Sequence, residues 1–285
     1  MSLPSESKSE FSPTTIPAQL PIGLDPSALL MVVRIAVARQ GRGVRRWVLA
    51  GVFALPIAFA ILIRQFRPNI EAAPLEDGLI LGLIFPALVP LAALLLASGM
   101  VQDDVEEQTL TYLLVRPIAR WAIYLAKLVG TAIVAWGRSA IFTAATLGAI
   151  YWGDSGLVGS VLRERVLIYV AMLALATAAY ASIFGALSLI LRRALVVGAI
   201  YVVVVEGFLG AIDFVIREAT VIYYIRVLAV RWLGVAGEDW SIDPDTAVSA
   251  STCVIVLLAI AGSFAAIGAA IFAGREFRLK TPEGN

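Results

Sequence analysis

The sequence predicts an all-α membrane protein of six transmembrane helices, with an amphipathic surface helix before the first span and a short amphipathic helix on the cytoplasmic side. Three observations support this prediction. First, 60% of the 285 residues are hydrophobic and 15% are charged, whereas a soluble chain carries about 25% charged residues. Second, charged residues are nearly absent from several blocks of about 20 residues, the length of a helix that crosses a bilayer. Third, Lys and Arg are more frequent in alternate connections between these blocks.

The N-terminal part is predicted to stay outside the bilayer core. Residues 1–25 are rich in Ser, Pro, Thr and Glu, which predicts a disordered cytoplasmic tail. Residues 26–46 contain a short apolar run that Arg34 and Arg39 interrupt, followed by a basic linker. We expect this run to be a helix that lies along the membrane surface. The first long apolar block starts only near Trp47, so no cleavable signal peptide is evident and the block is predicted to remain as an anchor.

Hydropathy predicts six spans within residues 47–273. Prolines fall inside the first two, where neighbouring helices can satisfy the carbonyls that a proline leaves free. Residues 274–285 are predicted to form a second cytoplasmic tail. The predicted spans are about 47–63, 78–100, 121–151, 166–190, 194–212 and 247–273.

The basic residues predict which side faces the cytoplasm. If the N-terminus is cytoplasmic, the inner segments carry 13 Lys and Arg residues and the outer segments carry 7. An excess of basic residues on the cytoplasmic side is the usual arrangement. Because six is an even number of spans, both termini are then predicted to lie in the cytoplasm, with the chain in the inner cell membrane.

Residues 219–236 are apolar enough to suggest a seventh span. Arg226 and Arg231 argue against it, because each would cost about 2.5–3.5 kcal/mol near the centre of a membrane helix. We therefore expect an amphipathic helix on the outer surface, with a seventh span as the alternative.

Two opposite charges are predicted at similar depth in the membrane. Arg138 follows Lys127 by 11 residues in the third span, and Glu206 follows Arg193 by 13 residues in the fifth. These separations correspond to depths of roughly 16 and 20 Å. Because buried charges in lipid require partners, we expect Arg138 and Glu206 to pair within one chain or across a dimer. The alternative is a protonated, hydrogen-bonded Glu206 with Arg138 reaching outward.

Glycines and tyrosines in the apolar blocks have structural interpretations. Gly262, Gly268 and Gly274 permit close helix contacts, and packing within one chain is favoured over a seam between two copies. The aromatic pairs Tyr151–Trp152 and Tyr223–Tyr224 fit an aromatic belt that anchors helix ends at the membrane interface.

The connection at 101–120 has the residue pattern of an amphipathic helix, which an ordinary loop does not require. Its acidic residues precede an apolar face of Leu110, Leu113 and Leu114 at i, i+3 and i+4, and Pro117 ends the helix. We place the acids at a helix N-terminus, where negative charge is favourable. An ordinary helix that only reverses the chain is the alternative, but the leucine face favours a partner groove. The acids are Asp103, Asp104, Glu106 and Glu107.

The run "GMVQDDVEEQTLTYLLVRPIARWAIYLAKLVGTAIV", residues 99–134, resembles the signature region of permease subunits of type-2 ABC exporters. That pattern has an acidic residue or pair, "TL", "LL", "P-(I/V)-x-R" and a Lys at the start of the next span. The six-span plan extends the resemblance over nearly the whole chain. Two positions depart from it, Gln108 in place of a common Gly and Arg116 in place of a small residue. The matches are Asp103, Asp104, Glu106, Thr109, Leu110, Leu113, Leu114, Pro117, Ile118, Arg120 and Lys127.

The resemblance implies that the segment is a coupling helix that docks into a separate ATPase subunit. Arg192 and Arg193, between the fourth and fifth spans, would form a second contact with that subunit. It also implies a second permease copy, as a homodimer or a heterodimer. None of the three lysines completes a phosphate-binding G-x-x-x-x-G-K-[ST] motif. ATP and Mg²⁺ are therefore expected in the partner, with no cofactor, no metal and no nucleic acid bound by this chain.

Two other classes of function are possible for a chain of this composition. An intramembrane enzyme is disfavoured, because the chain has no His and no two acids share mid-membrane depth. A membrane scaffold that anchors a cytoplasmic ATPase without transport is the remaining alternative. The sequence names no substrate.

Overall fold

The computed structural model of the chain describes residues 26–40, 44–67, 70–106, 119–152, 160–191, 193–208, 215–237, 240–243 and 247–274. These residues form helices and connecting turns, and no strand occurs among them. Five helices are long and apolar enough to cross a membrane, and a shorter apolar helix accompanies them. The predicted all-α membrane fold is confirmed.

In chain order, the described helices are α1 (Pro26–Gln40), α2 (Val44–Phe66), α3 (Ala72–Glu76), η1 (Asp77–Leu88), α4 (Val89–Glu106), α6 (Arg120–Ile150), α7 (Ser160–Ile190), α8 (Ala194–Tyr201), η2 (Val202–Phe208), η4 (Val215–Ala219), α9 (Val221–Leu233) and α10 (Ala250–Gly274).

The long apolar helices follow the order of the predicted spans, with one difference. The region predicted to span at 194–212 is described as helix only over Ala194–Phe208. At 1.5 Å per residue its 15 residues measure about 22 Å, which is short of a hydrocarbon core of about 30 Å. Residues 209–212 of this segment are outside the described residues, as are residues 1–25 and 275–285 of the two predicted tails.

The second span is one continuous helix with a widened middle. α3, η1 and α4 run without a break, and η1 has π-helical geometry. Pro86 lies inside η1 and Pro90 follows at the start of α4. Because a proline lacks the backbone N–H and crowds the preceding turn, it disturbs the regular α-helical ladder. The prolines thus account for an irregular helix here without ending it.

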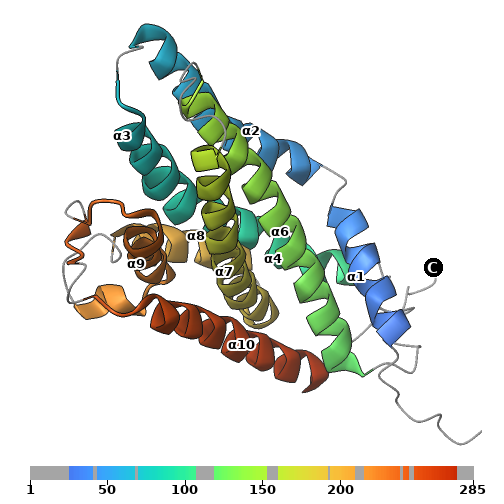
Figure 1. Ribbon diagram of the computed structural model, residues 1–285. Coiled ribbons are helices and arrows are strands. Elements are labelled where there is room, and N and C mark those ends of the chain that lie inside the picture. The colour runs from blue at the N-terminus through green and yellow to red at the C-terminus, as the bar shows by residue number, and fades with distance from the viewer. Residues whose placement is uncertain are drawn as a thin grey trace, which may run out of the picture.

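Helix α7 forms the centre of the bundle. It contacts α4, α6, α8, α9 and α10, and these helices surround it in Figure 1. Small residues such as Ala176 and Ala179 alternate with the large Tyr169, Tyr180 and Phe184 on its buried surface. The small residues let neighbouring helices approach closely.

Helix α9 corrects the expectation for residues 219–236. Its 13 residues measure about 20 Å, so it is too short to span. It is also no surface helix, because it packs against α7, α10 and η1 and buries most of its residues. Arg231 donates to the carbonyls of Ala247 and Val248, and the guanidinium of Arg226 lies over the Trp240 ring. The two arginines that argued against a span therefore have partners in the connection between α9 and α10.

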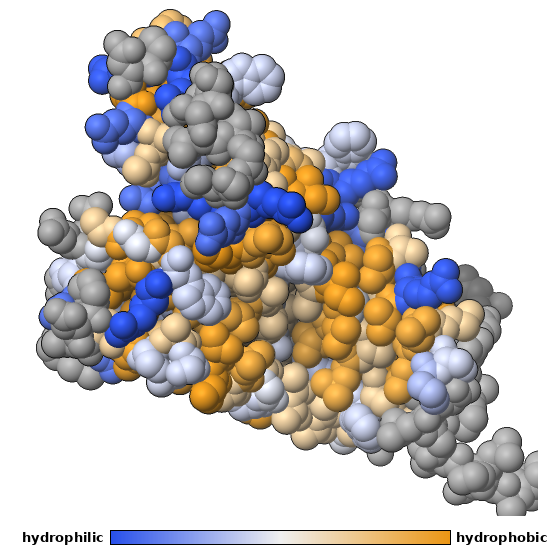
Figure 2. All heavy atoms as spheres, in the orientation of Figure 1, coloured by the Kyte–Doolittle hydropathy of each residue, from blue (hydrophilic) through white to orange (hydrophobic). Residues whose placement is uncertain are grey.

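Large apolar side chains cover the outside of the bundle. Leu55, Phe59 and Ile61 of α2 are each about half exposed, as is Leu258 of α10. Figure 2 shows apolar residues over most of the visible face. Apolar surface on this scale is unfavourable in water and fits contact with lipid.

Candidate functional site

The predicted coupling segment is only partly described. Helix α4 extends through Glu106, and α6 begins at Arg120, whose side chain is exposed. Asp103, Asp104 and Glu106 therefore belong to the last turn of α4. The expectation that they start a helix is wrong, because the helical backbone continues past the end of the apolar block. The other predicted residues, Glu107, Thr109, Leu110, Leu113, Leu114 and Pro117, lie outside the described residues.

The second predicted contact is a tight turn. α7 ends at Ile190 and α8 begins at Ala194. Arg193 occupies the N-cap position of α8, and its carbonyl accepts hydrogen bonds from the backbone N–H groups of Val196 at 3.1 Å and Val197 at 3.2 Å. Its side chain is exposed. Arg192 is not among the described residues.

Glu206 is fully buried and caps helix α9. Its carboxylate accepts hydrogen bonds from the backbone N–H groups of Val221, at 3.3 Å, and Ile222, at 3.0 Å. The hydroxyl of Tyr201 donates a third at 3.1 Å. Thr220 is the N-cap residue of α9, and its side-chain hydroxyl accepts a hydrogen bond from the backbone N–H of Tyr223. The first N–H groups of a helix have no intrahelical acceptors, and a helix N-terminus favours negative charge. The contact therefore satisfies both the Glu206 carboxylate and the first N–H groups of α9.

Arg138 has different surroundings from Glu206. Its Nη2 donates to the backbone carbonyl of Gln40, the last residue of α1, at 2.8 Å. Among the described residues, no ion pair joins Arg138 to Glu206, and the predicted pair within one chain is wrong. Similar depth in two helices does not put two side chains on facing surfaces. A pair across two copies stays a prediction.

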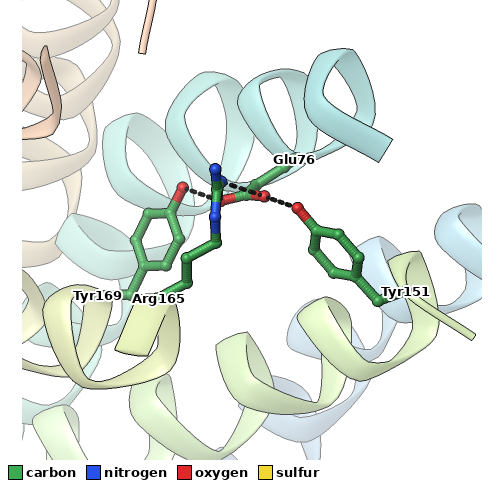
Figure 3. A network of polar contacts seen from close by, with 4 residues as sticks. All are labelled: Glu76, Tyr151, Arg165 and Tyr169. Carbon is green, nitrogen blue, oxygen red and sulfur yellow. Dashed lines mark hydrogen bonds and ion pairs between the residues drawn. The ribbon is translucent and has the colours of Figure 1, made fainter. Parts of the chain in front are cut away.

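A second buried carboxylate was not singled out from the sequence. Glu76, at the end of α3, is fully buried and forms an ion pair with Arg165 of α7 at 2.8 Å. Tyr151 donates to the same carboxylate at 2.5 Å and Tyr169 at 2.8 Å. Figure 3 shows the three side chains converging on Glu76, two from α7 and one, Tyr151, from the residue directly after α6. This network joins the second, third and fourth spans at one end of the bundle.

A signal for this network exists in the sequence. Glu76 comes two residues before the predicted second span, and Arg165 comes one residue before the predicted fourth. Both were predicted at the outer ends of their spans. Tyr151, expected to anchor at the membrane interface, is instead buried in the network.

The predicted surface helix α1 packs lengthwise against α6. Gly130 makes this possible, because a Cβ there would lie 2.9 Å from the Cβ of Ala36. Gln40 donates from Nε2 to Thr131 Oγ1 at 2.6 Å. Elsewhere on α1, Leu30 and Met31 are exposed. α1 is thus attached to the third span along its length, as Figure 1 shows.

The fold and the placement of its charged residues define a multi-pass α-helical membrane protein. A family model described as ABC-2 family transporter protein matches residues 16–226. The chain belongs to this family, and it is a permease component of an ABC transporter. The match ends within α9 and leaves out α10. No curated protein matches the chain.

Proposed function

We propose that this chain is the permease subunit of an ATP-driven exporter, in which a separate ATPase subunit supplies the energy. The family match over residues 16–226 carries the proposal. The chain has no phosphate-binding motif, so ATP and Mg²⁺ would bind to the partner. Two permease copies and two ATPase subunits would form the working unit in the inner cell membrane, with both termini of each permease cytoplasmic.

The connection between α4 and α6 is the proposed docking site for the ATPase. Three acids end α4, where the negative end of the helix dipole makes acidic residues unfavourable by about 0.3–1 kcal/mol each. Basic side chains of a partner would remove this penalty. The leucine face at 110–114 would then fill a groove of the ATPase.

Movement of the ATPase would reach the membrane through two long helices. α4 and α6 flank the docking connection, and both contact the central α7. A shift of the connection would therefore be transmitted to the bundle as a movement of rigid helices. The exposed Arg193, in the turn before α8, would provide a second contact for the same subunit.

Charge reversal tests the docking site. The variant Asp103→Lys/Asp104→Lys, purified from its native membrane, should lose recovery of the ATPase by at least about tenfold, since each like-charge contact costs several kcal/mol. Glu164→Lys is the matched control. Glu164 is an exposed acid near the start of α7, away from the connection between α4 and α6. Full recovery of the ATPase with the double variant would exclude docking at this connection.

A scaffold without transport is distinguished by disabling hydrolysis. If the chain exports a substrate with energy from ATP, a partner ATPase that binds but does not hydrolyse ATP should abolish export while the complex remains intact. Export or assembly that continues without hydrolysis would favour the scaffold.

A further inference from the structure

A cavity between α2, α4 and α6 has apolar walls and two cationic groups. Its volume is about 390 Å³, and Arg46 and Arg138 line it. The remaining lining residues are apolar, and Leu49, Phe53 and Leu96 among them are almost fully buried. The volume falls within the range of about 300–1,000 Å³ that is usual for small-molecule sites.

Within the part of the chain that the structure describes, the two guanidinium groups have no acidic partner at this cavity. No Asp or Glu is among its lining residues. Nη1 of Arg138 is buried and has no hydrogen-bond partner among the described residues. Arg46 lies close enough for its charge to act unfavourably on Arg138. Arg46 is exposed and Arg138 is partly buried, so the buried Nη1 of Arg138, beside a second cation, is costly unless an anion accompanies it.

One helix end and one aromatic ring beside the cavity offset only part of the positive charge of Arg46 and Arg138. The carbonyl of Gln40, at the C-terminus of α1, accepts from Nη2 of Arg138 and carries the partial negative charge of a helix end. The Arg46 guanidinium lies over the Trp47 ring, with 4.9 Å between Cζ and the ring centroid. Trp47 is 67% exposed. An exposed Trp beside a basic residue is typical of the boundary between lipid tails and head groups.

We propose that this cavity binds an anionic phospholipid of the surrounding bilayer. The lipid phosphate accepts hydrogen bonds from Nη1 of Arg138 and from Arg46, and part of one acyl chain packs against Leu49, Phe53 and Leu96. Basic pockets between membrane helices are known to bind anionic head groups. The lipid would hold α1 and α2 against α6. This inference goes beyond the proposed function and does not depend on it, because lipid binding requires neither ATP nor the ATPase.

Native mass spectrometry of the purified full-length chain tests the proposal. The chain is titrated with phosphatidylglycerol or phosphatidylcholine of identical acyl chains. We expect phosphatidylglycerol to bind about tenfold more tightly, and Arg138→Gln to abolish the preference. Arg138→Lys should keep most of it. Arg163→Gln, a change at an exposed arginine that does not line the cavity, should leave it unchanged.

A second variant examines the apolar part of the site. Ala50 lines the cavity and is partly exposed, so Ala50→Phe should fill space and weaken binding of phosphatidylglycerol without changing any charge. The proposal is overturned if both lipids bind equally, or if either Arg138→Gln or Ala50→Phe binds as the unchanged chain does. Displacement of the lipid by millimolar inorganic phosphate would indicate an anion site in place of a lipid site.

Discussion

Two buried carboxylates, Glu76 and Glu206, are held by different kinds of donor. Glu206 accepts from two backbone N–H groups and a tyrosine hydroxyl. Glu76 accepts from a guanidinium and two tyrosine hydroxyls. A buried carboxylate without donors would be highly unfavourable, so each of these residues fixes elements that are distant in sequence. Glu206 joins η2 to α9, and Glu76 joins α3 to α6 and α7.

Removing the Glu206 carboxylate should destabilise the contact between η2 and α9. Glu206→Ala leaves the N–H groups of Val221 and Ile222 without their acceptor, and we expect the free energy of unfolding to fall by about 1–3 kcal/mol. Thermal unfolding of the purified protein in detergent measures this change. Glu218→Ala, at an exposed acid close to the same helix N-terminus, is the control. Equal effects of the two substitutions would contradict the capping role.

The network around Glu76 should behave as an interacting unit. Glu76→Ala and Arg165→Ala remove partners of the same ion pair, so the double variant should be less destabilised than the sum of the single variants. The expected interaction energy is about 0.5–3 kcal/mol, measured in a double-mutant cycle on thermal stability. Replacing the exposed Arg163 by Ala in the same cycle provides the control. Additive effects of Glu76→Ala and Arg165→Ala would show that the ion pair contributes nothing to stability.

For single residues, the sequence predicted which charged side chains require a partner inside the membrane, but it did not predict which groups those partners are. Arg138 and Glu206 stand out as charges within apolar blocks, and both have specific contacts. Their pairing was inferred from depth alone. Depth follows from counting residues, whereas the direction of a side chain around its helix depends on how the helices pack. The partners of Glu206, 15 and 16 residues further along the chain, lie in a segment whose position hydropathy does not determine.

Among the structural elements, the packing of α10 against α6 depends on a glycine. Gly268 is buried, and a Cβ added there would overlap the hydroxyl and ring of Tyr124. Gly262 and Gly274 have no neighbouring atom within 4 Å of such a Cβ. The predicted use of small residues for packing within one chain therefore applies to Gly268, and the other two glycines leave the surface of α10 open.

Two substitutions of the same kind in α10 should have opposite consequences. Gly268→Ala forces Tyr124 or the helix to move, which we expect to cost about 1–3 kcal/mol. Gly262→Ala adds a methyl group in open space and favours the helix by up to about 1 kcal/mol. Thermal unfolding in detergent compares the two variants. If both variants have the same stability as the unchanged chain, the close contact with Tyr124 does not determine the position of α10.

Helix α9 shows where prediction of elements from hydropathy fails. A window of apolar residues with two arginines is compatible with a span, a surface helix or a buried helix. The structure selects the third, because Thr220 and Glu206 satisfy its first N–H groups, and because carbonyls of residues 247 and 248 accept from Arg231. Apart from the N-cap Thr220, these partners belong to other segments, so no local pattern could reveal them. The long spans were predictable because their length and low charge are properties of single helices.

At the scale of the whole molecule, charge and hydropathy predict six crossings and two cytoplasmic ends. Five helices meet the length that a span requires, and Ala194–Phe208 is shorter. The positions of the termini therefore depend on whether this shorter helix, with the residues that follow it, completes a crossing. Six crossings put α1 and the end of α10 on the same side of the membrane, and five put them on opposite sides.

Cysteine labelling decides between these two topologies. In a Cys253→Ser background, which removes the native thiol, single cysteines are introduced as Ser27→Cys near the start of α1 and Gly274→Cys at the end of α10. Both positions are exposed. A membrane-impermeant maleimide should label both in inside-out vesicles and neither in right-side-out vesicles, because the basic residues favour a cytoplasmic location for both ends. Labelling of the two positions from opposite sides would show that the helix at Ala194–Phe208 enters the bilayer without crossing it. The docking connection between α4 and α6 would remain on the side of α1, because its location depends only on the first two spans.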